Sequence, residues 1–182
     1  MENLSQKAQL RRMLQAARRA LPADVKAQAD ARIAARLQSW LATQPNARIL
    51  GAYLPLPGEP DLSELYLQLW ATGLQIAMPV VMEKNMPLRY AVWREGDALV
   101  KDASGTLAPA TRTAFLEVDI ALVPCVGFTD TKYRLGYGGG YFDRTLAKMP
   151  RPTSVGIAYA FTKTSFEESP VDIPLDVIIT DQ

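Results

Sequence analysis

The amino-acid sequence predicts an α/β fold in which helices cover both faces of a mostly parallel sheet. Segments with helical periodicity alternate along the chain with short apolar segments that are typical of buried strands. The chain has 182 residues, of which 48% are hydrophobic and 21% are charged. This length and composition indicate a globular protein that forms a single domain over residues 1–182.

Four segments are expected to be helical. In the first of them, apolar residues such as Leu10 and Leu14 recur at helical spacing. The other three are ended by proline or glycine, at Pro45, Gly73 and Pro150 respectively. The expected helices span residues 4–20, 22–45, 61–73 and 141–149.

The strands are expected where short apolar runs lie between these helices. They span residues 48–54, 74–81, 88–93, 120–124, 155–159 and 177–180. Residues 95–117 show no such pattern and are expected to be irregular. In folds of this class the ligand lies at the carboxyl ends of the parallel strands, where the loop from Pro55 to Pro60 begins.

The composition disfavours several classes of function. A net charge of +1, from 20 basic and 19 acidic residues, argues against binding of nucleic acid through bulk charge. No apolar run is long enough to span a membrane and no signal peptide is recognisable, so we expect a cytoplasmic protein. The single cysteine, Cys125, excludes an internal disulfide and fits a reducing compartment.

The chain contains no histidine. This removes the commonest general base, the Ser-His and Cys-His nucleophile pairs and most zinc sites. Any chemistry must therefore use carboxylates, lysine, arginine, tyrosine, a hard cation or the substrate itself.

The most informative part of the chain runs from Arg134 to Arg144 and is called here the glycine segment. Its sequence is Arg-Leu-Gly-Tyr-Gly-Gly-Gly-Tyr-Phe-Asp-Arg. Bare backbone lets N–H groups approach anionic oxygens, and the helix expected to follow adds further free N–H groups. The common phosphate-loop patterns do not fit, and a glycine run alone is more often a flexible turn. The strand before it and the helix after it favour a site for nucleotide phosphates.

Basic residues that could serve such a site occur in two places. Lys7 and Arg11 are four residues apart on one face of the first helix, and Arg18 falls near that face. Spacing alone favours a solvated basic face for these residues over a phosphate contact. Arg134 and, as the weaker candidate, Lys132 precede the glycines and can neutralise phosphate charge.

Acidic residues supply the remaining candidates. Glu59 lies in a loop, where a carboxylate can hold the polar edge of a ring or be an ordinary surface acid. Asp143 can hold Mg²⁺ beside phosphates or merely stabilise a helix N-terminus. Asp172 or Asp176 can supply a second cation ligand, although each alone is typical of a turn.

Taken together, these residues resemble the 5-formyltetrahydrofolate cyclo-ligase family, whose members are also called methenyltetrahydrofolate synthetases. The glycine segment is the specific motif, and weaker motifs follow the family's order over nearly the whole chain. The weaker motifs are Lys7-x-x-Leu10-Arg11, Tyr53 through Glu59 with Asp61, Val123-Pro124-x-x-x-Phe128, Val155-Gly-Ile-Ala158 and Asp172-Ile-Pro-Leu-Asp-Val-Ile-Ile-Thr180. The chain departs from the pattern at Phe142, Val171 and Ala108, where the family usually has tyrosine, often histidine, and usually glutamate respectively.

The resemblance implies a three-layer α/β/α fold of the NagB/RpiA/CoA-transferase type and an ATP- and Mg²⁺-dependent ligase. Such an enzyme converts 5-formyltetrahydrofolate, with or without a polyglutamate tail, to 5,10-methenyltetrahydrofolate through a phosphorylated formyl group. It releases ADP and phosphate, and we expect it to be a monomer. Two alternatives stay open, namely a non-catalytic nucleotide- or folate-binding paralogue and an ATP-dependent enzyme acting on another pterin-like substrate.

The resemblance also implies which residues bind the nucleotide. They are Lys7, Arg11, Arg134, Gly136, Tyr137, Gly138, Gly139, Gly140, Tyr141, Phe142 and Asp143. Among them, Arg134 and Tyr141 are the implied catalytic residues.

Folate and metal contacts follow from the resemblance in the same way. Tyr53 and Glu59 are implied to contact the folate, and Asp143 and Asp172 are implied to hold Mg²⁺.

Overall fold

A seven-stranded sheet forms the centre of the protein, whose computed structural model describes residues 2–182. The strand order is β11-β10-β7-β1-β2-β3-β6; the first five strands are parallel, and β3 pairs antiparallel with both of its neighbours, β2 and β6. In that order, the strands span Val177–Ile179, Thr153–Ile157, Ile120–Pro124, Ile49–Gly51, Gln75–Val80, Arg89–Val92 and Phe115–Leu116. The predicted α/β class with a mostly parallel sheet is confirmed.

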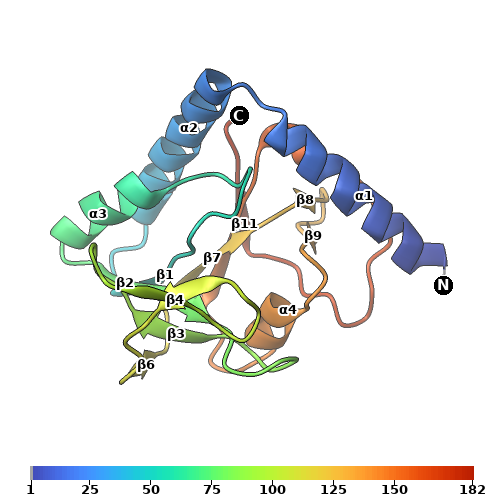
Figure 1. The fold of residues 1–182 in the computed structure, drawn as a ribbon. Helices are drawn as coiled ribbons and strands as arrows, with labels where there is room; N and C mark the ends of the chain where they lie inside the picture. Colours follow the sequence, from blue (N-terminus) through green and yellow to red (C-terminus); the bar gives the residue numbers. More distant parts are fainter. Residues whose placement is uncertain (1) are drawn as a thin grey trace.

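Two helices, α2 (Ala23–Leu41) and α3 (Ser63–Ala71), cover one face of this sheet (Figure 1). Their apolar stripes meet the sheet because helical residues four apart, such as Ile33 and Leu37, point the same way. Both of these side chains are fully buried against strand residues. The main core contains Ile33, Leu37, Leu50, Leu62, Tyr66, Ile76, Met78, Leu122 and Ile157.

The opposite face of the sheet has a thinner cover. The helix α4 (Tyr141–Leu146) has only six residues and packs through Leu146 onto Val123 and Ala158. Further along this face the strands carry small residues, and the ring of Tyr90 fills the space beside Gly51. A Cβ atom on Gly51 would lie 2.7 Å from that ring. The second helical layer expected from the alternating pattern is therefore short.

The helix α1 (Glu2–Arg19) packs on a small hairpin and not on the central sheet. The hairpin consists of β8 (Gly127–Phe128) and β9 (Arg134–Leu135), and the two residues of β9 are the first two of the glycine segment (Figure 1). Leu14 of α1 packs with Val126, Leu135 and Phe166. This contact brings the N-terminal helix and the glycine segment together.

The expectation that residues 95–117 are irregular was wrong. They contain β4 (Leu99–Lys101) and β5 (Leu107–Pro109), which form a hairpin, and the edge strand β6. Asp102 shapes the turn, because its carboxylate accepts hydrogen bonds from the backbone N–H groups of Ser104, Thr106 and Val81. Strands of two or three residues are too short to show a periodicity that a sequence could reveal.

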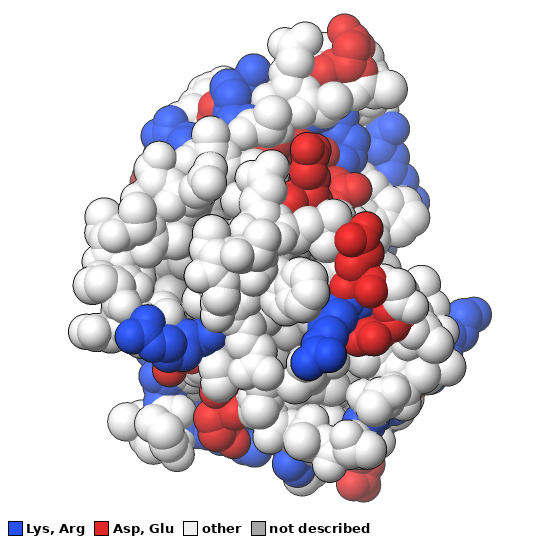
Figure 2. Space-filling model, turned by 90° about the vertical axis from the view of Figure 1, so that its left-hand side faces the viewer, with Lys and Arg blue, Asp and Glu red and all other residues white. Residues whose placement is uncertain are grey.

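Charges of both signs are scattered over the face shown in Figure 2, which lies at the left in Figure 1. No extended patch of a single sign is visible on this face. Within residues 2–182, no helix combines the length and apolar character that crossing a membrane requires.

We expect Gly127→Ala to lower the free energy of unfolding by about 1–3 kcal/mol, because overpacking would separate α1 from its hairpin. The new methyl carbon would lie 2.7 Å from Leu14 Cδ1 and 2.9 Å from the carbonyl oxygen of Thr162. Chemical denaturation measures the effect. Gly136→Ala is the matched control, since a Cβ atom there meets nothing within 4 Å. Equal losses in the two variants would contradict the packing argument.

Candidate active site

Three basic residues of α1 face the glycine segment and its surroundings. Lys7 is 9% exposed and Arg18 only 2%, so these two side chains do not form the solvated face that spacing alone favoured. Arg11 lies between them and donates from Nε to the carbonyl oxygen of Gly136 at 2.7 Å. Burial lowers the pKa of Arg11, and the negative charge of Asp172 opposes that shift.

The glycine segment adopts a backbone that other residues would resist. Gly138 and Gly140 have φ angles of +97° and +63°, in the left-handed region that favours glycine. A Cβ atom on Gly139 would lie 2.7 Å from the ring of Tyr141. The guanidinium of Arg144 lies over that ring and donates to the Gly139 carbonyl oxygen. The bare backbone therefore allows these two side chains to fold back onto the segment.

Glu59 lies beneath the glycine segment and is only 2% exposed. Its Oε1 accepts a hydrogen bond of 2.6 Å from the Tyr137 hydroxyl, and its Oε2 accepts one of 2.8 Å from the Leu56 N–H. Burial raises the pKa of Glu59, while these two hydrogen bonds and the positive charge of Arg18 act to lower it. The alternative of an ordinary surface acid is therefore wrong for Glu59.

Arg18 completes this cluster, although it was only a marginal candidate in the sequence. Its Nη2 donates to the Tyr137 hydroxyl at 2.7 Å and its Nη1 to the Cys125 carbonyl oxygen at 3.0 Å. Arg18 follows Lys7 by eleven residues, which is about three turns of a helix. This spacing could have shown that the two residues lie on the same face of α1. The sequence gives no sign, however, that a loop covers it.

Tyr53 takes a different place from the other candidates. Its side chain is 2% exposed, and its hydroxyl donates to the Pro60 carbonyl oxygen at 2.8 Å. Tyr53 therefore supports the loop that carries Glu59.

Cys125 is also buried in this part of the protein. It is 1% exposed, and desolvation raises the pKa of its thiol to about 12.

The two candidate metal ligands are both paired with cations. Asp143 forms an ion pair with Arg134 at 2.6 Å, and Asp172 accepts a hydrogen bond from Lys7 at 2.8 Å. The Ile173 N–H donates to Asp143 at 3.2 Å, so the segment that carries Asp172 also reaches Asp143. These contacts bring the start of α4, the start of α1 and the C-terminal segment together at one end of the glycine segment.

Phe142 and the remaining charged candidates have other surroundings. The Arg134 guanidinium lies over the ring of Phe142, and its Cζ atom is 5.9 Å from the ring centroid. Asp176 accepts hydrogen bonds from the backbone and hydroxyl of Ser154 at 2.8 and 2.7 Å, which fits the turn role. Lys132 donates to the carbonyl oxygen of Asp176, away from the phosphate candidates.

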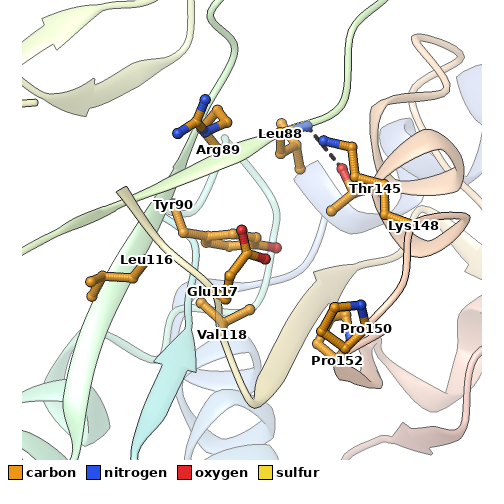
Figure 3. Close-up of a pocket in the computed structure, with 10 residues that line it drawn as sticks. All are labelled: Leu88, Arg89, Tyr90, Leu116, Glu117, Val118, Thr145, Lys148, Pro150 and Pro152. Carbon is orange, nitrogen blue, oxygen red and sulfur yellow. Dashed lines mark hydrogen bonds between the residues drawn. The ribbon is translucent and has the colours of Figure 1, made fainter. Parts of the chain in front are cut away.

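A hollow of about 300 Å³ lies on the thinly covered face of the sheet (Figure 3). It opens between the end of α4 and the strands β3 and β6, and Tyr90 forms its floor. The Tyr90 hydroxyl is buried without a hydrogen-bond partner among the described residues. The hollow is lined by Leu88, Arg89, Tyr90, Leu116, Glu117, Val118, Thr145, Lys148, Pro150 and Pro152. None of the candidate residues lines it.

We expect Asp172→Asn to lower the free energy of unfolding by about 1–2 kcal/mol at pH 7. Burial alone would raise the pKa of Asp172, but the hydrogen bonds from Lys7 and the Ser169 N–H outweigh it and hold the pKa below its usual range. Its contribution is therefore present above the unfolded-state pKa of about 4 and is lost as the pH falls through the folded-state pKa. Denaturation at several pH values should show the two proteins converging in acid. Asp130→Asn, at a side chain 81% exposed, is the control, and a gap that persisted in acid would contradict the prediction.

Comparison with known proteins extends over almost the whole chain. The model of the "5-formyltetrahydrofolate cyclo-ligase family" matches residues 3–181. A 5-formyltetrahydrofolate cyclo-ligase of Mycoplasma pneumoniae is 29% identical over 95% of this chain and 97% of its own length. One of Mycolicibacterium smegmatis is 30% identical over 96% of this chain and 91% of its own.

A solved structure agrees with these sequence matches. The 5,10-methenyltetrahydrofolate synthetase of Mycoplasma pneumoniae superposes with a TM-score of 0.80 at 28% identity, and the match covers 97% of this chain and 99% of that one. The resemblance seen in the motifs is confirmed, and the chain belongs to the 5-formyltetrahydrofolate cyclo-ligase family.

Proposed function

We propose that this chain converts 5-formyltetrahydrofolate to 5,10-methenyltetrahydrofolate while ATP is converted to ADP and phosphate. The observation that carries the proposal is the set of contacts around the glycine segment. Arg11 donates a hydrogen bond to its backbone, and Glu59 accepts one from the side chain of Tyr137. Asp143 forms an ion pair with Arg134. The family to which the chain belongs supports the same reaction.

The triphosphate of ATP is assigned to the space beside the glycine segment. Lys7, Arg11 and Arg134 supply positive charge there, and the backbone from Gly136 to Gly140 supplies N–H groups. Phosphoryl transfer asks a protein chiefly for positioning and for neutralisation of charge. A chain without histidine can meet both demands.

Asp143 and Asp172 fit a magnesium ion that is shared with the phosphates. Mg²⁺ in nucleotide sites commonly takes one or two carboxylates and completes its coordination with phosphate oxygens and water. When bound, the ion supplies positive charge to the β- and γ-phosphates. The arginine and lysine that neutralise the two carboxylates are then available to the triphosphate.

The substrate supplies its own nucleophiles in the proposed reaction. The N5-formyl oxygen attacks the γ-phosphorus, the bond from that phosphorus to the β–γ bridging oxygen breaks, and ADP leaves. N10 of the same molecule then adds to the formyl carbon and loses its proton, and the carbon–oxygen bond breaks with release of phosphate. The formyl oxygen is a poor leaving group until it is phosphorylated, and the internal amine is already close to the carbon.

The protein's part is to hold these groups in place. Glu59 is assigned to the polar edge of the pterin ring, with Tyr53 bracing its loop. Arg134 and Tyr141 are assigned to the γ-phosphate, on opposite sides of the four glycines. We further propose that the protein acts as a monomer in the cytoplasm and accepts folates with one or several glutamates.

One mixing experiment tests the proposal. Purified protein with ATP, Mg²⁺ and 5-formyltetrahydrofolate should generate the absorbance of the methenyl product, with ADP formed in equal amount. Omission of ATP is the control. Binding of both ligands without product would instead indicate the non-catalytic paralogue, and ADP formed only with another pterin would indicate the other enzyme.

Asp143→Asn is expected to reduce turnover by about a hundredfold or more, because it removes a charge that both the metal ion and Arg134 require. The Mg²⁺ concentration for half-maximal rate should rise, and the thermal stabilisation by Mg²⁺ with ADP should shrink. Asp24→Asn, on the exposed side of α2, is the matched control. Near-normal turnover with an unchanged Mg²⁺ dependence would rule out the role of Asp143.

A further inference from the structure

The glycine segment covers the carboxylate to which the pterin is assigned. The two partners are 78 residues apart in the chain, yet the Tyr137 hydroxyl donates to Glu59 Oε1 at 2.6 Å. The other oxygen is held by the Leu56 N–H, and the side chain of Glu59 is almost completely buried. Tyr137 itself is 44% exposed, so it forms the outer cover of this carboxylate. A ligand that takes the place of the Tyr137 hydroxyl at Oε1 must therefore displace Tyr137.

The basic side chains assigned to the triphosphate are also paired with other groups of the protein in this structure. Lys7 is paired with Asp172, and Arg134 is paired with Asp143. The guanidinium of Arg11 donates to the backbone carbonyl of the glycine segment. The arrangement is therefore closed toward both ligands at once, because protein groups satisfy the charges that the ligands would otherwise meet.

Arg18 fixes the direction of the bond between Tyr137 and Glu59. Its Nη2 donates to the Tyr137 hydroxyl at 2.7 Å, so that oxygen accepts from Arg18 and its proton points to Glu59. Arg18 is itself held by the Cys125 carbonyl oxygen and is 2% exposed. The Tyr137 hydroxyl thus links the buried guanidinium of Arg18 to the carboxylate that is assigned to the pterin.

We propose that Tyr137 is a gate that couples the binding of folate to the binding of nucleotide. N–H donors of the pterin replace the Tyr137 hydroxyl at Glu59, and the glycine segment is released to receive the triphosphate. Because one opening serves both ligands, whichever binds first removes the cost of opening for the other. Hydrolysis of ATP without folate is thereby suppressed. The inference rests on the assignment of folate and ATP made under the proposed function.

Binding measurements on Tyr137→Phe test the gate. The variant removes the hydroxyl that closes Glu59 and keeps the ring. In the unchanged protein, 5-formyltetrahydrofolate and a non-hydrolysable ATP analogue should each tighten the binding of the other by roughly fivefold or more. In Tyr137→Phe, each ligand alone should bind roughly tenfold more tightly or better, as expected for one lost hydrogen bond to a charged group. The mutual effect should then fall close to one.

Tyr133→Phe is the matched control, because Tyr133 lies in the turn before β9 and contacts the cluster around Leu14. It should keep the affinities and the coupling of the unchanged protein. The gate is overturned if Tyr137→Phe binds folate more weakly, or if the two ligands bind the unchanged protein independently. The measurement on the unchanged protein stands even if a variant folds poorly. Failure of the unchanged protein to bind either ligand would instead overturn the proposed function, and with it the gate.

Discussion

The need of buried cations for partners is the constraint on which this site depends. A guanidinium as enclosed as that of Arg18 requires acceptors, and a buried cation without them would be strongly destabilising. Arg18 has two neutral acceptors, while its Nε has no hydrogen-bond partner among the described residues. The acceptors come from separate parts of the chain, namely Cys125 after β7 and Tyr137 in the glycine segment. The same demand joins Lys7 to the C-terminal segment and Arg134 to α4. These contacts therefore join α1, the chain after β7, the glycine segment with the start of α4, and the C-terminal segment.

The sequence predicts the central sheet well because its strands are short apolar runs between helices with clear stripes. The glycine segment could also be found, since an apolar strand precedes the four glycines and a helical stretch with an acid follows them. The β8–β9 hairpin could not, because strands of two residues have no readable period. Nor could the burial of Lys7 and Arg18 be foreseen, since spacing shows which residues share a face but not what covers it.

The hollow beside α4 and the candidate residues lie in different parts of the protein. The hollow is lined by residues of β3 and β6 and of the chain at the end of α4, and none of the candidate residues is among them. The candidate residues around the glycine segment are instead paired with one another, as Lys7 is with Asp172 and Tyr137 with Glu59. In this protein the candidate binding residues are therefore recognised by buried charges and their partners.

The burial of Cys125 has a practical consequence. Thiolate is the form that alkylating reagents attack, and a pKa of about 12 leaves almost none of it at neutral pH. The sulfur is also shielded from solvent by the packing around α4. A cysteine introduced on an exposed loop would therefore be modified selectively, so a fluorophore could be attached at one chosen point without removal of the native thiol.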